Sequence, residues 1–158
     1  MKLTALLERL QYEVVQGTKE IEITELTNDS RKVTEGSVFV CISGAVSDGH
    51  QYIEEVGKKG AAAVIVEKDV EAPKHMTVIR VEDTRYALAL ASAAYFGYPA
   101  EQLKVIGITG TKGKTTTTYM VKSILEEVGH KVGLIGTIEA IIGDEVIPAV
   151  NTTPESFT

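Results

Sequence analysis

Residues 104–129 read KVIGITGTKGKTTTTYMVKSILEEVG, an apolar run followed by a glycine-rich turn and an amphipathic segment. The run 104–109 predicts a buried strand, and the apolar spacing over 114–128 predicts a helix that ends at Gly129. A further apolar run over 131–138 predicts a second strand. Strand, helix and strand in this order form one βαβ unit, so this part of the chain is expected to belong to an α/β domain.

The turn GTKGKT, residues 110–115, has the residue types that a phosphate-binding loop needs between a strand and a helix. Glycines let backbone N–H groups face phosphate oxygens, and the helix N-terminus adds partial positive charge. Lys114 is expected to reach the β- and γ-phosphates of ATP, and the Thr115 hydroxyl is expected to bind Mg²⁺. The first glycine of the general pattern would fall at Ile108, so the spacing is a variant. A glycine-rich turn that needs only tight packing is the alternative interpretation.

Residues 1–98 alternate between apolar runs typical of strands and segments with helical spacing. Strands are expected over 21–23, 38–42, 61–66 and 78–81, and helices over the segments that start near Leu3, Tyr52 and Thr84. Thr84 is expected to cap its helix. This alternation favours a mainly parallel α/β sheet over an all-β sandwich. A boundary is expected to divide a small N-terminal domain, 1–98, from the start of a second domain, 99–158, in which Gly143-Asp144 predicts a hairpin turn.

Composition excludes several classes of function. The net charge of -6 argues against non-specific nucleic-acid binding, which needs a basic surface. No apolar stretch approaches the roughly 20 residues of a membrane helix, and the first residues lack the pattern of a signal peptide, so a cytoplasmic protein is expected. The single cysteine, Cys41, lies in an apolar run and is expected to be buried. His50, His75 and His130 lack the spacing of a metal site.

Three motifs carry a resemblance to a known family. The string GITGTKGKTTT, residues 107–117, resembles the phosphate loop of the Mur ligase family, which commonly has asparagine where this chain has Lys112. The strings NDSR, residues 28–31, and DGH, residues 48–50, resemble the UDP-binding first domain of that family. Residues 151–154, NTTP, are similar to the substrate loop of the members that add the third residue of the peptide stem.

The resemblance implies an N-terminal fragment of an ATP-dependent, amide-forming ligase of peptidoglycan synthesis. It implies an α/β fold in which a small UDP-binding domain precedes the start of a P-loop domain. The substrates would be UDP-N-acetylmuramoyl-L-Ala-D-Glu and an amino acid, a diamino acid by this resemblance, joined through an acyl phosphate with ATP and Mg²⁺. The ATP-binding residues would be Gly110, Thr111, Lys112, Gly113, Lys114, Thr115 and Thr116. The substrate-binding residues would be Ser30, Asn151, Thr152 and Thr153.

Two rival interpretations remain open. One is a P-loop hydrolase or kinase with an unrelated first domain, and the other is a non-catalytic module that binds a UDP-sugar peptide. From the residues alone, Asp29 and Ser30 could equally form a turn whose side chains bond the local backbone. After the P-loop strand, no second apolar strand ends in an acidic residue that could hold Mg²⁺, so the chain alone is expected to be inactive. It is also expected to be monomeric.

Overall fold

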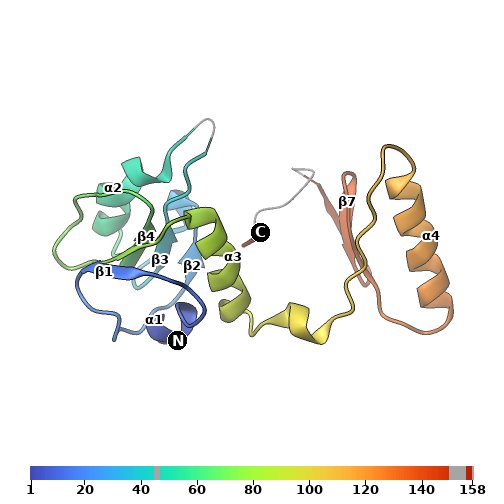
Figure 1. Ribbon diagram of the computed structural model, residues 1–158, viewed down its shortest axis with the longest axis horizontal. Coiled ribbons are helices and arrows are strands. Elements are labelled where there is room, and N and C mark those ends of the chain that lie inside the picture. Colours follow the sequence, from blue (N-terminus) through green and yellow to red (C-terminus); the bar gives the residue numbers. More distant parts are fainter. Residues whose placement is uncertain (45–46, 150–155, 158) are drawn as a thin grey trace. The chain divides into compact units, whose positions relative to one another are not determined.

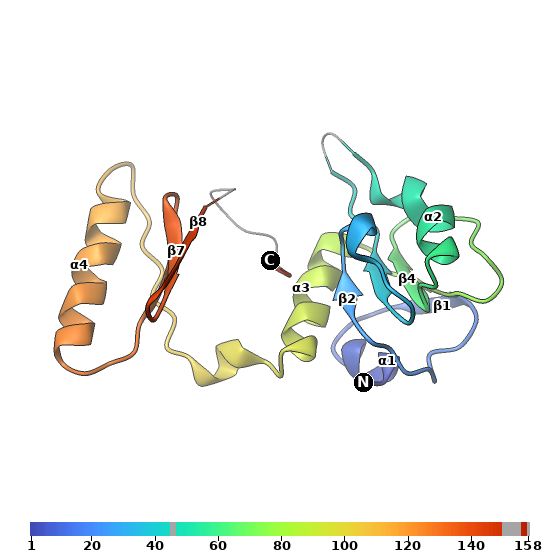
Figure 2. The ribbon, with the colours of Figure 1, turned by 180° about the vertical axis from the view of Figure 1, so that it is seen from behind.

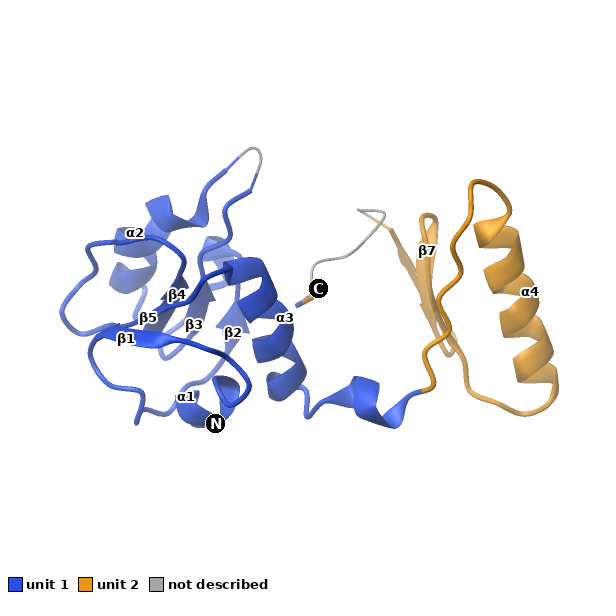
Figure 3. Ribbon diagram, viewed as in Figure 1, with its two compact units in different colours: residues 1–103, 157 blue, residues 104–156, 158 orange. Residues whose placement is uncertain are grey.

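The computed structural model describes residues 1–44, 47–149 and 156–157. The chain forms two compact units, the first made of residues 1–103 with Phe157 and the second of the described residues from Lys104 to Ser156 (Figure 3). Each unit is described by itself. Across these described ranges, no helix is both long and apolar enough to cross a membrane.

The first unit is built on a five-stranded sheet with the strand order β1-β5-β4-β3-β2 (Figure 3, in the view of Figure 1). Its strands are β1 (Glu13–Gln16), β2 (Leu26–Thr27), β3 (Val38–Val40), β4 (Ala63–Val66) and β5 (Thr77–Arg80). Strands β2 to β5 run parallel to their neighbours, and β1 pairs antiparallel with β5 at one edge. The mainly parallel α/β sheet predicted from the sequence is therefore confirmed for this unit.

Helices cover both faces of this sheet (Figure 2). They are α1 (Leu3–Leu6), α2 (Ile53–Lys58) and α3 (Thr84–Tyr95), and short 3₁₀ helices lie in the connections as η1 (Ser30–Lys32), η2 (Gly49–Tyr52) and η3 (Pro99–Gln102). Val38 and Val40 pack in one core cluster with α1 and α3, whereas Phe39 packs in a second cluster with α2. Because successive strand residues point to opposite faces, a strand covered on both sides must be apolar throughout.

The buried position expected for Cys41 is confirmed, since the residue is fully buried next to β3. It lies in the same cluster as Phe39 and the α2 residues Ile53 and Val56. Burial raises the pKa of the Cys41 thiol. The side chain therefore acts as a small apolar group of the core.

The start of α3 corrects one prediction. The cap is Asp83, whose carboxylate accepts hydrogen bonds from the backbone N–H groups of Arg85 at 2.8 Å and Tyr86 at 2.9 Å. Thr84, which the sequence favours as the cap, is the first residue inside the helix. Both bonds go to Oδ1 of Asp83, so one carboxylate oxygen directly before the helix satisfies two N–H groups that the first helical turn leaves without partners.

The strand predicted over 21–23 does not form. Glu22 makes only an isolated bridge with Lys2, and Ile23 is buried in the core cluster of α1 and α3. Ile21 and Ile23 alternate with polar residues because both pack against this core, and not because they belong to a strand. Earlier in the chain, β1 forms over Glu13–Gln16, where no strand was expected, because these residues are largely exposed and lack a buried alternation.

The second unit contains α4 (Lys114–Glu127) and a three-stranded sheet of order β6-β7-β8. Its strands are β6 (Gly133–Ile135), β7 (Glu139–Ile142) and β8 (Glu145–Pro148). The predicted helix and the hairpin turn at Gly143 are confirmed. Tyr119 of α4 donates its hydroxyl hydrogen to the Glu139 carboxylate of β7, which raises the pKa of Tyr119.

The predicted βαβ unit is wrong for this structure. Strand β6 pairs antiparallel with β7, and residues 104–109 form no strand. Val105 is 78% exposed and Ile106 is 62% exposed, so the run predicted to be buried is open to solvent. Within the described residues, no strand offers it a hydrogen-bonded neighbour, and a strand forms only where its backbone groups are paired.

Candidate functional site

The carboxyl ends of the parallel strands meet at one edge of the first unit's sheet, here called the carboxyl edge. The residues that follow these ends include Ser30 after β2, Ser43 after β3, Glu67 after β4 and Thr84 after β5. In open parallel sheets, ligands bind in the crevice outside this edge. The carboxyl edge is therefore the candidate ligand site of the first unit.

Ser30 begins η1 in a turn that Asp29 and Arg31 hold closed. The Asp29 carboxylate accepts hydrogen bonds from the Arg31 backbone N–H at 3.0 Å, from its Nε at 2.9 Å and from its Nη2 at 2.7 Å. The Arg31 guanidinium and backbone N–H lower the pKa of Asp29 to about 2. On the other side, the Ser30 carbonyl accepts a hydrogen bond from Lys59 Nζ at 2.9 Å. The turn is thus fixed through its backbone and its flanking charges.

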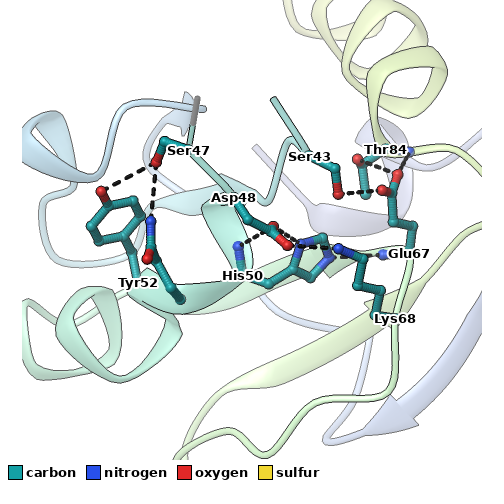
Figure 4. Close-up of polar contacts among 9 residues, drawn as sticks. Ser43, Ser47, Asp48, His50, Tyr52, Glu67, Lys68 and Thr84 are labelled. Atoms are coloured by element: carbon teal, nitrogen blue, oxygen red, sulfur yellow. Dashed lines mark hydrogen bonds and ion pairs between the residues drawn. The ribbon is translucent and has the colours of Figure 1, made fainter. Parts of the chain in front are cut away.

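His50 lies between the carboxylate of Asp48 and the backbone of Glu67 (Figure 4). Its Nε2 accepts a hydrogen bond from the Glu67 N–H at 3.2 Å, and its Nδ1 lies 2.6 Å from Asp48 Oδ1. Because a backbone N–H only donates, Nε2 is unprotonated and Nδ1 carries the proton that Asp48 accepts. Lys68 Nζ donates to the second Asp48 oxygen at 2.6 Å. Lys68 and His50 hold the pKa of Asp48 well below its usual range.

Glu67 joins three parts of the carboxyl edge through its side chain and its backbone. Its carboxylate accepts hydrogen bonds from Ser43 Oγ at 2.5 Å, from the Thr84 N–H at 3.0 Å and from Thr84 Oγ1 at 2.7 Å (Figure 4). The hydroxyl of Ser43 and then the amide of Thr84 lower the pKa of Glu67 to about 2. A hollow of about 330 Å³ opens beside it, lined by Ile42, Ser43, Glu67, Glu82, Asp83, Thr84 and Arg85.

The candidate phosphate loop, residues 110–115, lies in the second unit and leads into α4. Gly113 occupies the N-cap position with a φ of 78°, in the left-handed region that side chains with a Cβ rarely adopt. Nothing lies within 4 Å of a Cβ built at this glycine, so the conformation rather than the space calls for glycine. Lys114 Nζ donates a hydrogen bond to the Gly110 carbonyl at 2.7 Å. The loop is exposed to solvent.

The first turn of α4 is suited to bind an anion. The first backbone N–H groups of a helix have no acceptor inside it, and no side chain among the described residues caps α4. The helix dipole adds partial positive charge at this end, beside the Lys114 ammonium. Thr117 Oγ1 donates to the Gly113 carbonyl at 2.9 Å and Thr118 Oγ1 donates to the Thr115 carbonyl at 2.7 Å. These bonds hold a run of threonines that is otherwise poorly suited to a helix.

The structure brings the predicted site residues into two groups. Gly110 to Thr116 follow one another around the phosphate loop and the start of α4 in the second unit, and Ser30 lies at the carboxyl edge of the first. The predicted substrate residues Asn151, Thr152 and Thr153 lie outside the described residues. Glu67 and Ser43 were not among the predicted site residues. The acidic residue directly after the apolar run 61–66 is visible in the sequence, but its contacts with Ser43 and Thr84 are not.

Two family models match the chain in succession. Residues 22–98 match the model described as Mur ligase family, catalytic domain, and residues 108–158 match the Mur ligase middle domain. The UDP-N-acetylmuramoyl-L-alanyl-D-glutamate--2,6-diaminopimelate ligase of Clostridium perfringens is 49% identical over 99% of this chain and 32% of its own length. The chain therefore spans about a third of the length of this curated relative.

Solved structures show the same similarity. MurF from Acinetobacter baumannii is 31% identical, with a TM-score of 0.62 over 85% of this chain and 30% of that one. A structure of a UDP-N-acetylmuramoyl-L-alanyl-D-glutamate--2,6-diaminopimelate ligase aligns over 99% of this chain and 31% of that one, with a TM-score of 0.73. At 20% identity, this second alignment speaks for the fold alone.

Proposed function

The chain belongs to the Mur ligase family, and from this premise we propose that it forms the first third of an ATP-dependent ligase of peptidoglycan synthesis. The proposed reaction joins 2,6-diaminopimelate to the D-glutamate carboxylate of UDP-N-acetylmuramoyl-L-alanyl-D-glutamate. The observation that carries this proposal is the 49% identity, over 99% of the chain, to the Clostridium perfringens ligase with that name.

The proposal divides the chain by task. Residues 1–98 are the domain that binds the UDP-muramoyl substrate, and residues 99–158 are the beginning of the ATP-binding domain. The carboxyl edge, with Ser30 at the end of β2, supports the first assignment because ligands of parallel sheets bind at such edges. The loop before α4 supports the second.

The residues of the phosphate loop, 110–115, are suited to bind a nucleoside triphosphate. The N-cap glycine, the uncapped first turn of α4 and the Lys114 ammonium together offer backbone N–H groups and positive charge to an anion. Bound ATP and Mg²⁺ would supply the activation of the substrate carboxylate by phosphorylation. The amides of Gly110 to Thr116 would wrap the phosphates, Lys114 would neutralise charge on the β- and γ-oxygens, and the Thr115 hydroxyl would ligate Mg²⁺.

Lys114 must change its partner for this role. In this structure its ammonium donates a hydrogen bond to the Gly110 carbonyl, which is a neutral acceptor in an exposed loop. A phosphate oxygen is a better acceptor for an ammonium because both groups carry charge. Nucleotide binding is therefore expected to draw Lys114 Nζ away from the Gly110 carbonyl.

The UDP-muramoyl substrate is proposed to contact Ser30 in the first domain and Asn151, Thr152 and Thr153 in the second. The fixed turn around Ser30 supports this, because Asp29, Arg31 and Lys59 hold the backbone without using the Ser30 hydroxyl in these bonds. The proposal also includes a cytoplasmic, monomeric protein. Sedimentation of the full-length protein measures the second property.

The isolated chain is proposed to bind substrate without catalysing ligation. The chain spans about a third of its curated relative, so most of the residues that complete such an enzyme would lie elsewhere. Calorimetric titration of the 158-residue chain and of the full-length protein measures binding, and detection of the amide product measures ligation. We expect UDP-muramoyl dipeptide to bind to both and ligation only in the full-length protein. Binding to neither would contradict the proposed function.

A further inference from the structure

The connection from β3 to η2 closes on itself like a short hairpin at the carboxyl edge. The Gly44 N–H donates to the Ser47 carbonyl at 3.0 Å, and the Gly49 N–H donates to the Ile42 carbonyl at 2.9 Å. Ser43 and Asp48 form an isolated antiparallel bridge. The described residues of this segment, 42–44 and 47–50, are here called the edge loop. Backbone hydrogen bonds join its two sides at its base.

The dipeptide Glu67-Lys68, which directly follows β4, holds this base at three points. The Glu67 carboxylate accepts from Ser43 Oγ at 2.5 Å, and the Glu67 N–H donates to His50 Nε2 at 3.2 Å. Lys68 Nζ donates to Asp48 Oδ2 at 2.6 Å. Figure 4 shows the three side chains of the edge loop, Ser43, Asp48 and His50, turned toward this dipeptide.

These contacts join connections at the carboxyl edge rather than residues of the apolar core. Glu67 and Lys68 directly follow β4, and they contact Ser43, Asp48 and His50 in the connection from β3 to η2. The helix α3 already has Asp83 as its cap, so the bonds from Thr84 to Glu67 are an additional link between α3 and β4. The network lies instead at the rim of the hollow of about 330 Å³ that Ser43, Glu67 and Thr84 help to line.

We propose that Glu67 and Lys68 are positioning residues for the UDP-bearing end of the substrate. They connect the base of the edge loop, through Ser43, Asp48 and His50, with the start of α3 beside the hollow, so that the nucleotide would meet a preformed surface there. Neither residue is assigned a contact with the reacting atoms. A loop held before binding loses less conformational freedom when the ligand arrives, so releasing it weakens binding. This inference rests on the proposed function of the first domain.

The test uses the full-length protein with Glu67 changed to Ala and to Gln. Glu67→Ala removes both carboxylate oxygens, which accept the hydrogen bonds from Ser43 and Thr84. We expect the KM for UDP-muramoyl dipeptide to rise about tenfold or more. The KM for ATP should stay within about twofold because the phosphate loop lies in the other unit. Glu67→Gln keeps an oxygen for Thr84 and offers N–H to Ser43 Oγ, which is able to accept, so it should recover most of the affinity. The matched control is Glu54→Gln, a carboxylate of α2 whose side chain is 79% exposed.

A merely structural role predicts another pattern. Loss of folded protein lowers the apparent kcat and leaves both KM values unchanged, and that result for Glu67→Ala would overturn the proposal. Lys68→Met provides a milder test, because the Lys68 side chain is 51% exposed and its loss should not unfold the domain. We expect its KM for the UDP substrate to rise about threefold. An unchanged KM would count against a positioning role for the contact between Lys68 and Asp48.

These measurements distinguish failure of the proposed function from failure of the positioning role. If the wild-type protein fails to bind UDP-muramoyl dipeptide, the proposed function is wrong. If the wild type binds it and Glu67→Ala binds it equally well, only the positioning role is wrong. If Glu67→Gln is as weak as Glu67→Ala although both are folded, the hydrogen-bond geometry assigned to Ser43 and Thr84 is wrong.

Discussion

Lys114 Nζ donates a hydrogen bond to the carbonyl oxygen of Gly110, four residues earlier, at a distance of 2.7 Å. The lysine at the first position of α4 thus folds back across the loop that precedes the helix. The contact places the ammonium beside the uncapped helix N-terminus, where a bound anion would be stabilised by both. In the proposed nucleotide site, Lys114 would exchange this carbonyl for a phosphate oxygen.

The first prediction concerns Lys114 in the full-length protein. We expect Lys114→Met to weaken binding of Mg-ATP at least about hundredfold. The change removes the ammonium that lies against the loop, and with it a charge-assisted hydrogen bond to phosphate. Binding of UDP-muramoyl dipeptide should not change. Calorimetric titration measures both affinities.

Lys112→Asn is the matched control for this change. Lys112 is an exposed lysine of the same loop, and asparagine removes its charge while keeping the backbone N–H group. We expect its ATP affinity to stay within about threefold of wild type. If the two variants lost affinity equally, general positive charge rather than the position of Lys114 would explain binding.

The second prediction concerns acid stability. Bonds from Ser43 and Thr84 lower the pKa of Glu67 from its ordinary 4.5 to about 2 in the folded protein. A lowered folded-state pKa gives stability that is complete above pH 4.5 and is lost as the pH falls toward 2. Glu67→Gln cannot titrate, so its free energy of unfolding should fall less steeply than that of wild type across this window. Urea denaturation at a series of pH values measures the difference, and parallel slopes would contradict the assignment.

The third prediction concerns the cap of α3. Asp83→Ala removes the acceptor for the Arg85 and Tyr86 amides and should lower the free energy of unfolding of the first unit by about 1 kcal/mol. Asp83→Asn should lose much less, because asparagine also caps helices well. Glu71→Ala, a change at an exposed loop residue, serves as the control. A loss for Asp83→Ala no larger than for Glu71→Ala would show that the cap contributes nothing.

The fourth prediction concerns residues 104–109. Their apolar sequence is that of a central strand, yet Val105 and Ile106 are 78% and 62% exposed here. We propose that further strands of the full-length protein pair with this run. Hydrogen exchange should therefore be fast at these amides in the 158-residue chain and slow in the full-length protein. Fast exchange in both proteins would mean that the run is not a strand in either.

The sequence predicted the elements whose burial follows directly from their own residues. The apolar runs around Val38 and Val64 are strands because both faces of the sheet are covered, so each residue reports its burial. The helix after Gly113 and the turn at Gly143 were equally predictable from local residue types. Positive φ at Gly129 and Gly113 agrees with the use of glycine where a Cβ is penalised.

What the sequence did not reveal depends on partners far along the chain. Strand β1 forms because β5 offers it an edge, although Val14 and Val15 remain exposed. Residues 104–109 have strand-like residues and no described neighbour, so they form none. Glu67 gains its role only because Ser43 and Thr84, from other connections, meet it at the carboxyl edge. No local pattern reports which side chains a fold brings together.

A crystal structure of the full-length protein with Mg²⁺ and a non-hydrolysable ATP analogue tests the nucleotide site directly. We expect phosphates to occupy the loop of residues 110–115, with Lys114 Nζ released from the Gly110 carbonyl and bonded to a phosphate oxygen. An analogue bound elsewhere, with the contact between Lys114 and Gly110 intact, would contradict this expectation.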